Sequence, residues 1–124
     1  ETLRRSWRDH DFFFVHVKPT DAAGEDGDFE RKVRIIEEVD GLLPRILQLE
    51  PDVLAVTGDH ATPARLRSHS WHGVPFLLRS PYTLPTARSF GERACAGGSL
   101  GVFPAQEIMG YLMGHALKLN RYGA

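Results

Sequence analysis

The sequence has 124 residues, of which 42% are hydrophobic and 25% are charged, and its formal net charge is -1. A chain of this size and composition can form about one globular domain with a buried core. The small net charge provides no general attraction for nucleic acid or for an anionic membrane, so we expect neither as a partner. The single cysteine, Cys95, excludes an internal disulfide and a thiolate-rich metal site. Because no leader and no long apolar span is evident either, we expect a cytoplasmic location.

Three short apolar runs predict β-strands. Residues 12–17 (FFFVHV) form a nearly continuous apolar run rich in aromatic and β-branched residues, which is typical of a strand buried on both faces. Residues 53–56 and 75–78 predict a second and a third strand. His16 lies inside the first run, so we expect it to be a hydrogen-bonded histidine of the core and not a ligand.

Helices are predicted between and after these strands. Apolar residues recur at close to helical spacing over residues 29–47, although Gly41 and Pro44 are expected to kink or divide this helix. Residues 20–28 (TDAAGEDGD) are rich in Gly and Asp and predict a loop that supplies helix caps. A closing helix is expected over residues 105–119. The predicted fold class is therefore α/β, with a mostly parallel sheet and flanking helices.

Polar residues follow the first two predicted strands. A strand, a crossover helix and a second strand imply parallel pairing, and open sheets of this type bind ligands beyond the carboxyl ends of their strands. Asp21 and Glu25 follow the first strand, and Asp59 and His60 follow the second, so we expect all four at one rim of the sheet. Carboxylates and imidazoles without a thiolate suit Mn, Co, Zn or Mg in a catalytic site with open positions.

Simpler interpretations exist for each of these polar residues. Asp59 could cap a short helix that begins at TPARL, and Asp26 and Asp28 could likewise be helix caps. His69 and His72 could be surface residues of a loop. The metal-site interpretation is favoured by the joint placement of several ligand types after two strands, and not by any single residue.

Four stretches of the sequence resemble a known family. They are HVKPTDAAGEDGDFERKVRIIEEVD, PDVLAVTGDHATP, SHSWHGVPFLLRSP and FGERACAGGSLG. Together they resemble the carboxyl-terminal half of archaeal-type cofactor-independent phosphoglycerate mutases, members of the alkaline phosphatase superfamily. The resemblance runs from about residue 12 to the last predicted helix. It implies that residues 1–124 are the carboxyl-terminal part of a longer enzyme, with a partial alkaline-phosphatase-like core.

The resemblance also implies two divalent metal ions and assigns their ligands by motif position. One ion takes Asp21, Glu25 and His69, and the other takes Asp59 and His60. Manganese is the expected metal, with cobalt, zinc and magnesium as alternatives. Many superfamily members have a histidine where this chain has Glu25, a change that can alter the metal preference without removing the site.

The activity implied by the resemblance is the interconversion of 3-phosphoglycerate and 2-phosphoglycerate in glycolysis and gluconeogenesis, through a phosphoserine. In the family the nucleophilic serine lies far upstream of the segment present here. We therefore assign no catalytic residue in this chain and expect the isolated chain to be inactive. A phosphatase or another phosphoryl hydrolase of the same superfamily is the alternative enzyme, and a non-catalytic interaction module is the alternative from another class.

The expected partners are the phosphoglycerate substrate and either the missing amino-terminal half of the same enzyme or a second copy of the chain. Three successive aromatic residues, Phe12, Phe13 and Phe14, cannot all point to one face of a strand. At least one of these side chains is therefore expected to need cover from outside the chain, at a bare edge of the sheet.

Overall fold

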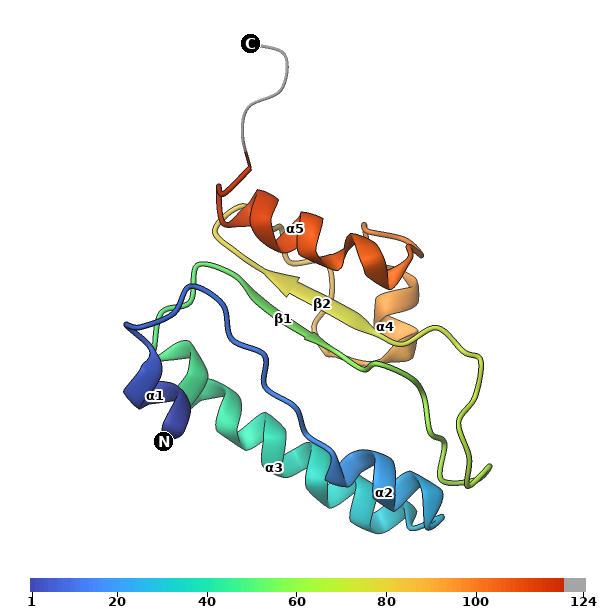
Figure 1. The fold of residues 1–124 in the computed structure, drawn as a ribbon. Coiled ribbons are helices and arrows are strands. Elements are labelled where there is room, and N and C mark those ends of the chain that lie inside the picture. Colours follow the sequence, from blue (N-terminus) through green and yellow to red (C-terminus); the bar gives the residue numbers. More distant parts are fainter. Residues whose placement is uncertain (120–124) are drawn as a thin grey trace. The chain divides into compact units, whose positions relative to one another are not determined.

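The computed structural model describes residues 1–119, which fold as part of two compact units (Figure 1). Unit 1 comprises Glu1–Pro51 and Ala61–Ser70, and the described part of unit 2 comprises Asp52–His60 and residues 71–119. Helices and strands are both present, so the predicted mixed α/β class is confirmed. None of the helices within the described part of the chain is long and apolar enough to cross a membrane.

Unit 1 contains the helices α1 (Thr2–Ser6), α2 (Pro19–Glu25) and α3 (Phe29–Leu47). Helix α3 confirms the prediction from the apolar repeat, and Asp28 caps it by accepting a hydrogen bond from the backbone N–H of Arg31 at 2.9 Å. The predicted division of this helix is wrong, because α3 continues through Gly41 and Pro44. Pro44 lies in the last turn, where the hydrogen bond that it removes affects only the end of the helix.

Helix α2 corrects the loop predicted for residues 20–28. Pro19 stands at the start of the helix, where its fixed φ angle is favourable, and Asp21 lies in the first turn near the positive end of the helix dipole. Gly27 follows the helix with a φ angle of 74° and ends it in the left-handed region. Asp21 and Glu25 are four residues apart, so the helix places them on one face, which a loop would not do.

Helix α2 carries two of the buried residues of unit 1. Ala23 is fully buried and Gly24 is buried beside it. The two helices lie side by side in Figure 1 and are in contact. The missing side chain of Gly24 leaves room for the backbone carbonyl of Thr62, from the 61–70 loop, to lie against α2.

The strand predicted over residues 12–17 is not formed, and this prediction is wrong. Residues 12–17 are irregular, and the backbone of residues 12–16 makes no hydrogen bond to any other part of the described chain. An apolar run of this kind becomes a strand only when a neighbouring strand pairs with it. His16 is exposed, so the prediction that it belongs to the core is also wrong.

The three phenylalanines of this segment differ in their environments. Phe13 stacks on Trp7, with ring centroids 4.8 Å apart, whereas Phe12 is 54% exposed and Phe14 is 82% exposed. Exposed aromatic side chains of this size are typical of interaction surfaces. The expectation that a partner covers them stays a prediction.

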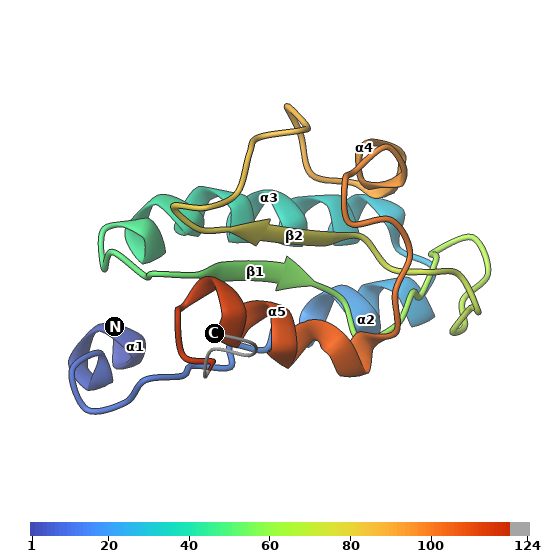
Figure 2. The ribbon, with the colours of Figure 1, turned by 90° about the horizontal axis from the view of Figure 1, so that it is seen from above.

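Unit 2 contains the strands β1 (Leu54–Thr57) and β2 (Phe76–Arg79), which lie near the second and third predicted strands. Figure 2 shows the two arrows side by side and pointing in opposite directions. They form a two-stranded antiparallel sheet in which Leu54 faces Arg79 and Thr57 faces Phe76. The mostly parallel sheet that we predicted is not found in the described residues, because residues 12–17, the expected parallel neighbour, form no strand.

Three short helical elements of unit 2 follow the sheet, and Phe103 links this segment to β2. Helix α4 (Glu92–Ala96), the 3-10 helix η1 (Ala105–Glu107) and helix α5 (Ile108–His115) follow the sheet. Phe103 contacts the rings of Phe76 and Tyr111, with centroids 5.3 and 5.0 Å away. The closing helix predicted over residues 105–119 is shorter than expected, because Leu117 has a φ angle of 56°, a left-handed conformation that ends it.

Candidate metal-binding site

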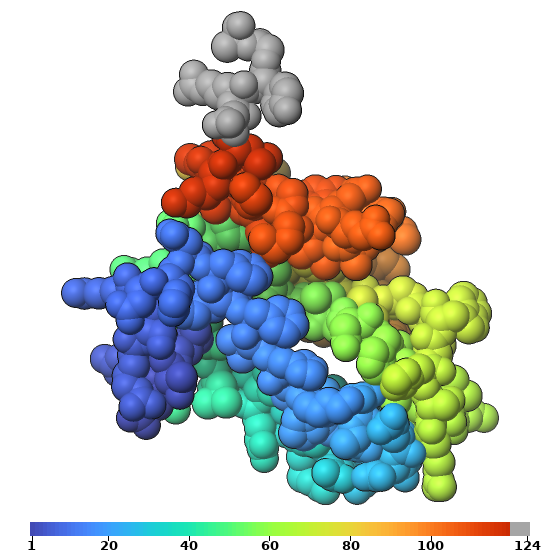
Figure 3. Space-filling model, viewed as in Figure 1, coloured from blue at the N-terminus to red at the C-terminus, as the bar shows by residue number. Residues whose placement is uncertain are grey.

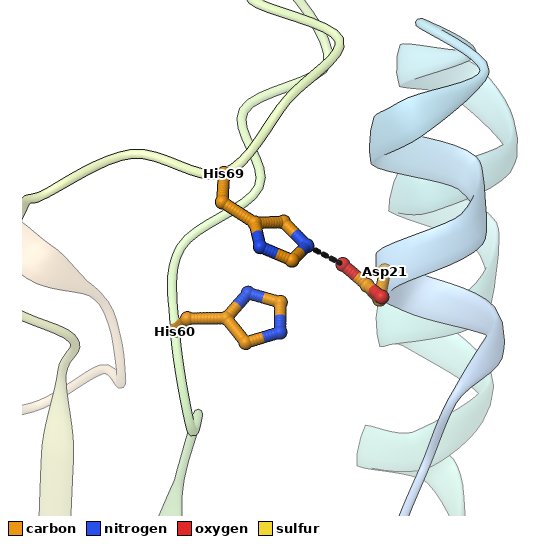
Figure 4. Close-up of side chains that lie close together, drawn as sticks. All are labelled: Asp21, His60 and His69. Carbon is orange, nitrogen blue, oxygen red and sulfur yellow. Dashed lines mark ion pairs between the residues drawn. The ribbon is translucent and has the colours of Figure 1, made fainter.

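Unit 1 brings together one histidine and two carboxylates. The Nε2 atom of His69 lies 3.6 Å from Oδ1 of Asp21 and 3.7 Å from Oε1 of Glu25. Figure 4 shows the His69 ring extending from its loop toward the Asp21 carboxylate on α2. Asp21, Glu25 and His69 are the three residues that the family resemblance assigned to one ion, and the structure places their side chains next to one another.

The loop of residues 61–70 carries His69 to helix α2. Its two ends are joined by an antiparallel bridge, in which the backbone N–H of Ser70 donates to the carbonyl of Ala61 at 2.8 Å. Thr62 comes directly after Ala61 and His69 comes directly before Ser70, so both residues lie next to the bridge, within the loop that it closes. In the space-filling view the yellow-green atoms of this loop lie against the light-blue atoms of α2 (Figure 3).

The Asp21 carboxylate is held by two other side chains of unit 1. The hydroxyl of Thr62 donates a hydrogen bond to Oδ1 at 2.6 Å, and the ammonium group of Lys18 pairs with Oδ2. The Asp21 side chain is only 12% exposed, whereas His69 and Glu25 are 56% and 53% exposed. A largely buried carboxylate with fixed partners is oriented before a ligand arrives, while the other two side chains remain accessible from solvent.

The distances within this cluster fit a bound divalent ion. Metal–oxygen and metal–nitrogen bonds of about 2.0 to 2.2 Å place neighbouring ligands of a tetrahedral ion about 3.4 Å apart. The distances of His69 from the two carboxylates exceed this value by only a few tenths of an ångström and are longer than a good hydrogen bond. Two carboxylates with one imidazole, and no thiolate, are a donor set that suits manganese, zinc or cobalt.

Asp59 and His60 lie together in unit 2, at the end of the segment that follows β1. The backbone N–H of His60 donates to Oδ1 of Asp59 at 3.1 Å, and its Nε2 lies 3.6 Å from Oδ2. The helix that Asp59 could have capped is not formed, since residues 64–67 make a turn in which Leu66 N–H donates to the carbonyl of Pro63. The capping interpretation of Asp59 is therefore wrong.

Two residues of the cluster were missed in the sequence. Thr62 and Lys18 both contact Asp21, but neither was singled out as a site residue. Lys18 is three residues before Asp21, and that helical spacing could have identified it. Thr62 is 41 residues away from Asp21 along the chain, and no spacing rule connects the two positions.

The sequence of the chain matches the model of a known protein family. The family model of the Metalloenzyme superfamily matches residues 1–115. The chain belongs to the Metalloenzyme superfamily. The family description and the cluster of two carboxylates and one imidazole both suggest that the chain binds a divalent metal ion.

Within the Metalloenzyme superfamily, the chain is similar to several proteins named as probable 2,3-bisphosphoglycerate-independent phosphoglycerate mutases. It is 54% identical to that of Thermus thermophilus, 53% to that of Aquifex aeolicus and 52% to that of Deinococcus radiodurans. Each alignment covers the whole chain but only 30 to 31% of the relative, so the chain spans about a third of the length of the curated relatives that it matches. The predicted resemblance to cofactor-independent phosphoglycerate mutases is confirmed.

A solved structure of a protein from Pyrococcus horikoshii has a closely similar fold. The TM-score is 0.92 at 35% sequence identity, and the match covers 99% of this chain and 38% of the other. The same fold is therefore retained in a relative in which two of every three aligned residues differ.

Gly24 of this chain is expected to tolerate no larger side chain. A Cβ atom at this position would overlap the carbonyl oxygen of Thr62 and approach the ammonium group of Lys32 to 3.1 Å. We therefore expect Gly24→Ala to lower the free energy of unfolding by about 1 to 3 kcal/mol.

Urea unfolding followed by circular dichroism measures this effect, and Gly41→Ala is the matched control. A Cβ atom at Gly41, inside α3, would meet nothing within 4 Å. The control is expected to raise the free energy of unfolding by about 0.5 to 1 kcal/mol, since alanine favours a helix interior over glycine. Equal effects of the two substitutions would contradict the close approach of the 61–70 loop to α2.

Proposed function

We propose that this chain is the metal-binding part of a cofactor-independent phosphoglycerate mutase, which interconverts 3-phosphoglycerate and 2-phosphoglycerate through a phosphoserine. The observation that supports this most strongly is the 52 to 54% identity, along the whole chain, to relatives that are named as probable enzymes of this type. The clustering of Asp21, Glu25 and His69 in unit 1 supports the metal-binding role.

Two ligand sets are proposed for two divalent ions, with manganese as the expected metal. Asp21, Glu25 and His69 would hold one ion. Asp59 and His60 would contribute to the second, together with residues that lie outside this chain. His60 is bonded directly to Ala61, the first residue of the loop that carries Thr62 and His69, so the covalent chain keeps the two sets close in sequence.

In this proposal the chain supplies metal ligands, and the nucleophile comes from the rest of the enzyme. Divalent ions supply neutralisation of the charge on phosphoryl oxygens and activation of an attacking oxygen. The carboxylates and imidazoles of this chain would hold and orient such ions, with Thr62 and Lys18 in contact with the Asp21 carboxylate. The serine that carries the phosphoryl group belongs, in this proposal, to the part of the enzyme that the relatives have in addition.

The isolated 124-residue chain is expected to show no mutase turnover. It lacks the proposed serine, and metal ligands alone cannot carry a phosphoryl group between two hydroxyls. An assay that couples the formation of 2-phosphoglycerate to enolase, run with added Mn²⁺, measures this directly. Turnover that persists through repurification and disappears in Asp59→Ala would show that the chain contains a nucleophile of its own.

A chimeric enzyme tests the proposed activity. The 124 residues would replace the matching segment of the Thermus thermophilus relative, to which they are 54% identical. The chimera is expected to convert 3-phosphoglycerate to 2-phosphoglycerate in the presence of Mn²⁺. Release of inorganic phosphate without 2-phosphoglycerate would favour a phosphatase, and a folded chimera with neither product would favour a non-catalytic module.

The proposed partner of this chain is the remainder of the same enzyme, with a second copy of the chain as the alternative. The exposure of Phe12 and Phe14 supports a need for cover. A monomeric mass by light scattering, combined with protection of both rings from solvent, would contradict this part of the proposal. The cytoplasm is the proposed location, in keeping with the single free cysteine, Cys95.

A further inference from the structure

We propose that Thr62 is a positioning residue of the metal site, whose hydroxyl fixes the Asp21 carboxylate for the ion. This inference rests on the proposed metal-binding function and assigns a role to a residue outside the proposed ligand sets. Thr62 does not need to touch the metal, because it acts through Asp21. Such outer hydrogen-bond partners orient metal ligands and typically account for a 10- to 100-fold effect on metal affinity.

The geometry of the contact identifies Thr62 as the donor. Its Oγ1 atom lies 2.6 Å from Oδ1 of Asp21, and an ionised carboxylate can only accept. This length is in the range of about 2.5 to 2.7 Å that is typical of a hydroxyl bound to a charged oxygen. Thr62 is 4% exposed and the Asp21 side chain is 12% exposed, so water competes poorly for this contact.

The backbone of Thr62 is held from two helices. The ammonium group of Lys32, on α3, donates to the Thr62 carbonyl at 2.5 Å, and Gly24, on α2, leaves the space in which that carbonyl lies. The bridge between Ala61 and Ser70 fixes the adjacent part of the loop. Because these contacts involve neither a metal nor any proposed ligand, the hydroxyl is in place before an ion binds.

The shape around Thr62 explains why a threonine suits this position. Its methyl group, Cγ2, is 3.0 Å from the place where a Cβ atom of Gly24 would lie, so the methyl faces the glycine while the hydroxyl faces Asp21. Valine has the same shape without the hydroxyl, and serine keeps the hydroxyl without the methyl. These two replacements therefore separate the hydrogen bond from the packing.

Calorimetric titration of the chain with Mn²⁺ tests the inference, with the absorption spectrum of the Co²⁺-loaded chain as a second readout. Thr62→Val is expected to raise the dissociation constant for Mn²⁺ by about 10- to 100-fold and to change the Co²⁺ spectrum. Thr62→Ser is expected to stay within about threefold of the original chain. Lys32→Met, which releases the Thr62 carbonyl but keeps the hydroxyl, is expected to raise the dissociation constant less than Thr62→Val does.

Thr83→Val is the matched control. Thr83 also makes hydroxyl hydrogen bonds, donating to the carbonyl of Ser80 at 2.9 Å and accepting from its N–H at 3.0 Å, but it lies in unit 2 and away from the proposed ligands in sequence. The Thr83→Val substitution is expected to leave the Mn²⁺ affinity unchanged. The thermal unfolding midpoint of each variant identifies any that is unfolded, and Lys32→Met then carries the test in place of Thr62→Val.

The outcomes separate this inference from the proposed function. Equal Mn²⁺ affinities of Thr62→Val, Thr62→Ser and the original chain would overturn the role of Thr62 and leave the metal site standing. Equal weakening by Thr62→Val and Thr62→Ser would also overturn it, because the hydroxyl would not be the decisive group. An original chain that binds neither Mn²⁺ nor Co²⁺ would overturn the proposed metal site and this inference together.

Discussion

Asp21→Asn is expected to weaken Mn²⁺ binding to the chain by at least about 100-fold. The substitution removes the charge of the least exposed proposed ligand, and an amide presents only one acceptor oxygen to its neighbours. Loss of an outer hydrogen-bond partner alone typically weakens binding by 10- to 100-fold, so loss of a charged ligand should have the larger effect. Calorimetry with Mn²⁺ and metal analysis after dialysis measure the affinity and the amount bound.

Asp26→Asn provides a control on the same segment of the chain. Asp26 follows α2 and pairs with Arg31 at 2.9 Å, and its side chain is 63% exposed. An exposed ion pair of this kind contributes little to stability, so the control should keep both its fold and its metal affinity. Equal losses of Mn²⁺ in the two variants would show that general acidity, and not the cluster at His69, attracts the metal.

Asp59→Ala is expected to reduce the turnover of the chimeric enzyme by at least about 1,000-fold. Removing a ligand of the second proposed ion would remove charge stabilisation at the reacting phosphoryl group, and the loss of even one oxyanion-stabilising donor costs about 100- to 1,000-fold. Enolase-coupled rates at saturating Mn²⁺ provide the measurement. Asp59 is 75% exposed in this chain, so its replacement should not disturb folding.

Asp52→Ala, in the same unit, serves as the reference for this experiment. Asp52 is exposed and precedes β1, whereas Asp59 follows it. The reference variant should turn over at the rate of the unmodified chimera. Turnover of Asp59→Ala within about tenfold of that rate would show that Asp59 is not a ligand of a catalytic ion, since such a loss is far below that expected for removal of charge stabilisation.

Local signals predicted the long helix well and the short one badly. Helix α3 has an apolar repeat of many residues and a capping aspartate, Asp28, and both signals act within the segment itself. Helix α2 has seven residues, and its Gly and Asp content is typical of a loop. It contacts α3, and its residues Ala23 and Gly24 are buried by distant parts of the chain, which a short stretch of sequence does not reveal.

The sheet was predicted less accurately because strand pairing is not local. The positions of β1 and β2 were indicated by their apolar residues, but nothing within those residues specifies a parallel or an antiparallel neighbour. Residues 12–17 have the composition of a buried strand and remain irregular with Phe14 82% exposed. Composition therefore identified a segment suited to a sheet, while the pairing depends on which neighbour is present.

The proposed ligands could be named from the sequence, but their surroundings could not. Asp21, Glu25 and His69 stand at recognisable motif positions, and the structure brings their side chains together. Thr62 and Lys32 act on this cluster over separations of 41 and 30 residues, through a hydroxyl and a backbone carbonyl. Contacts of this kind arise from the packing of a loop on two helices, and no spacing pattern in the sequence predicts them.

A crystal structure of the chain grown with Mn²⁺ and measured at the manganese absorption edge tests the central claim most directly. The account predicts an anomalous peak within about 2.0 to 2.3 Å of a carboxylate oxygen of Asp21, a carboxylate oxygen of Glu25 and a ring nitrogen of His69. An ordered cluster without an anomalous peak at saturating Mn²⁺, or a peak that contacts none of these three residues, would contradict the assignment of the chain as the metal-binding part of the enzyme.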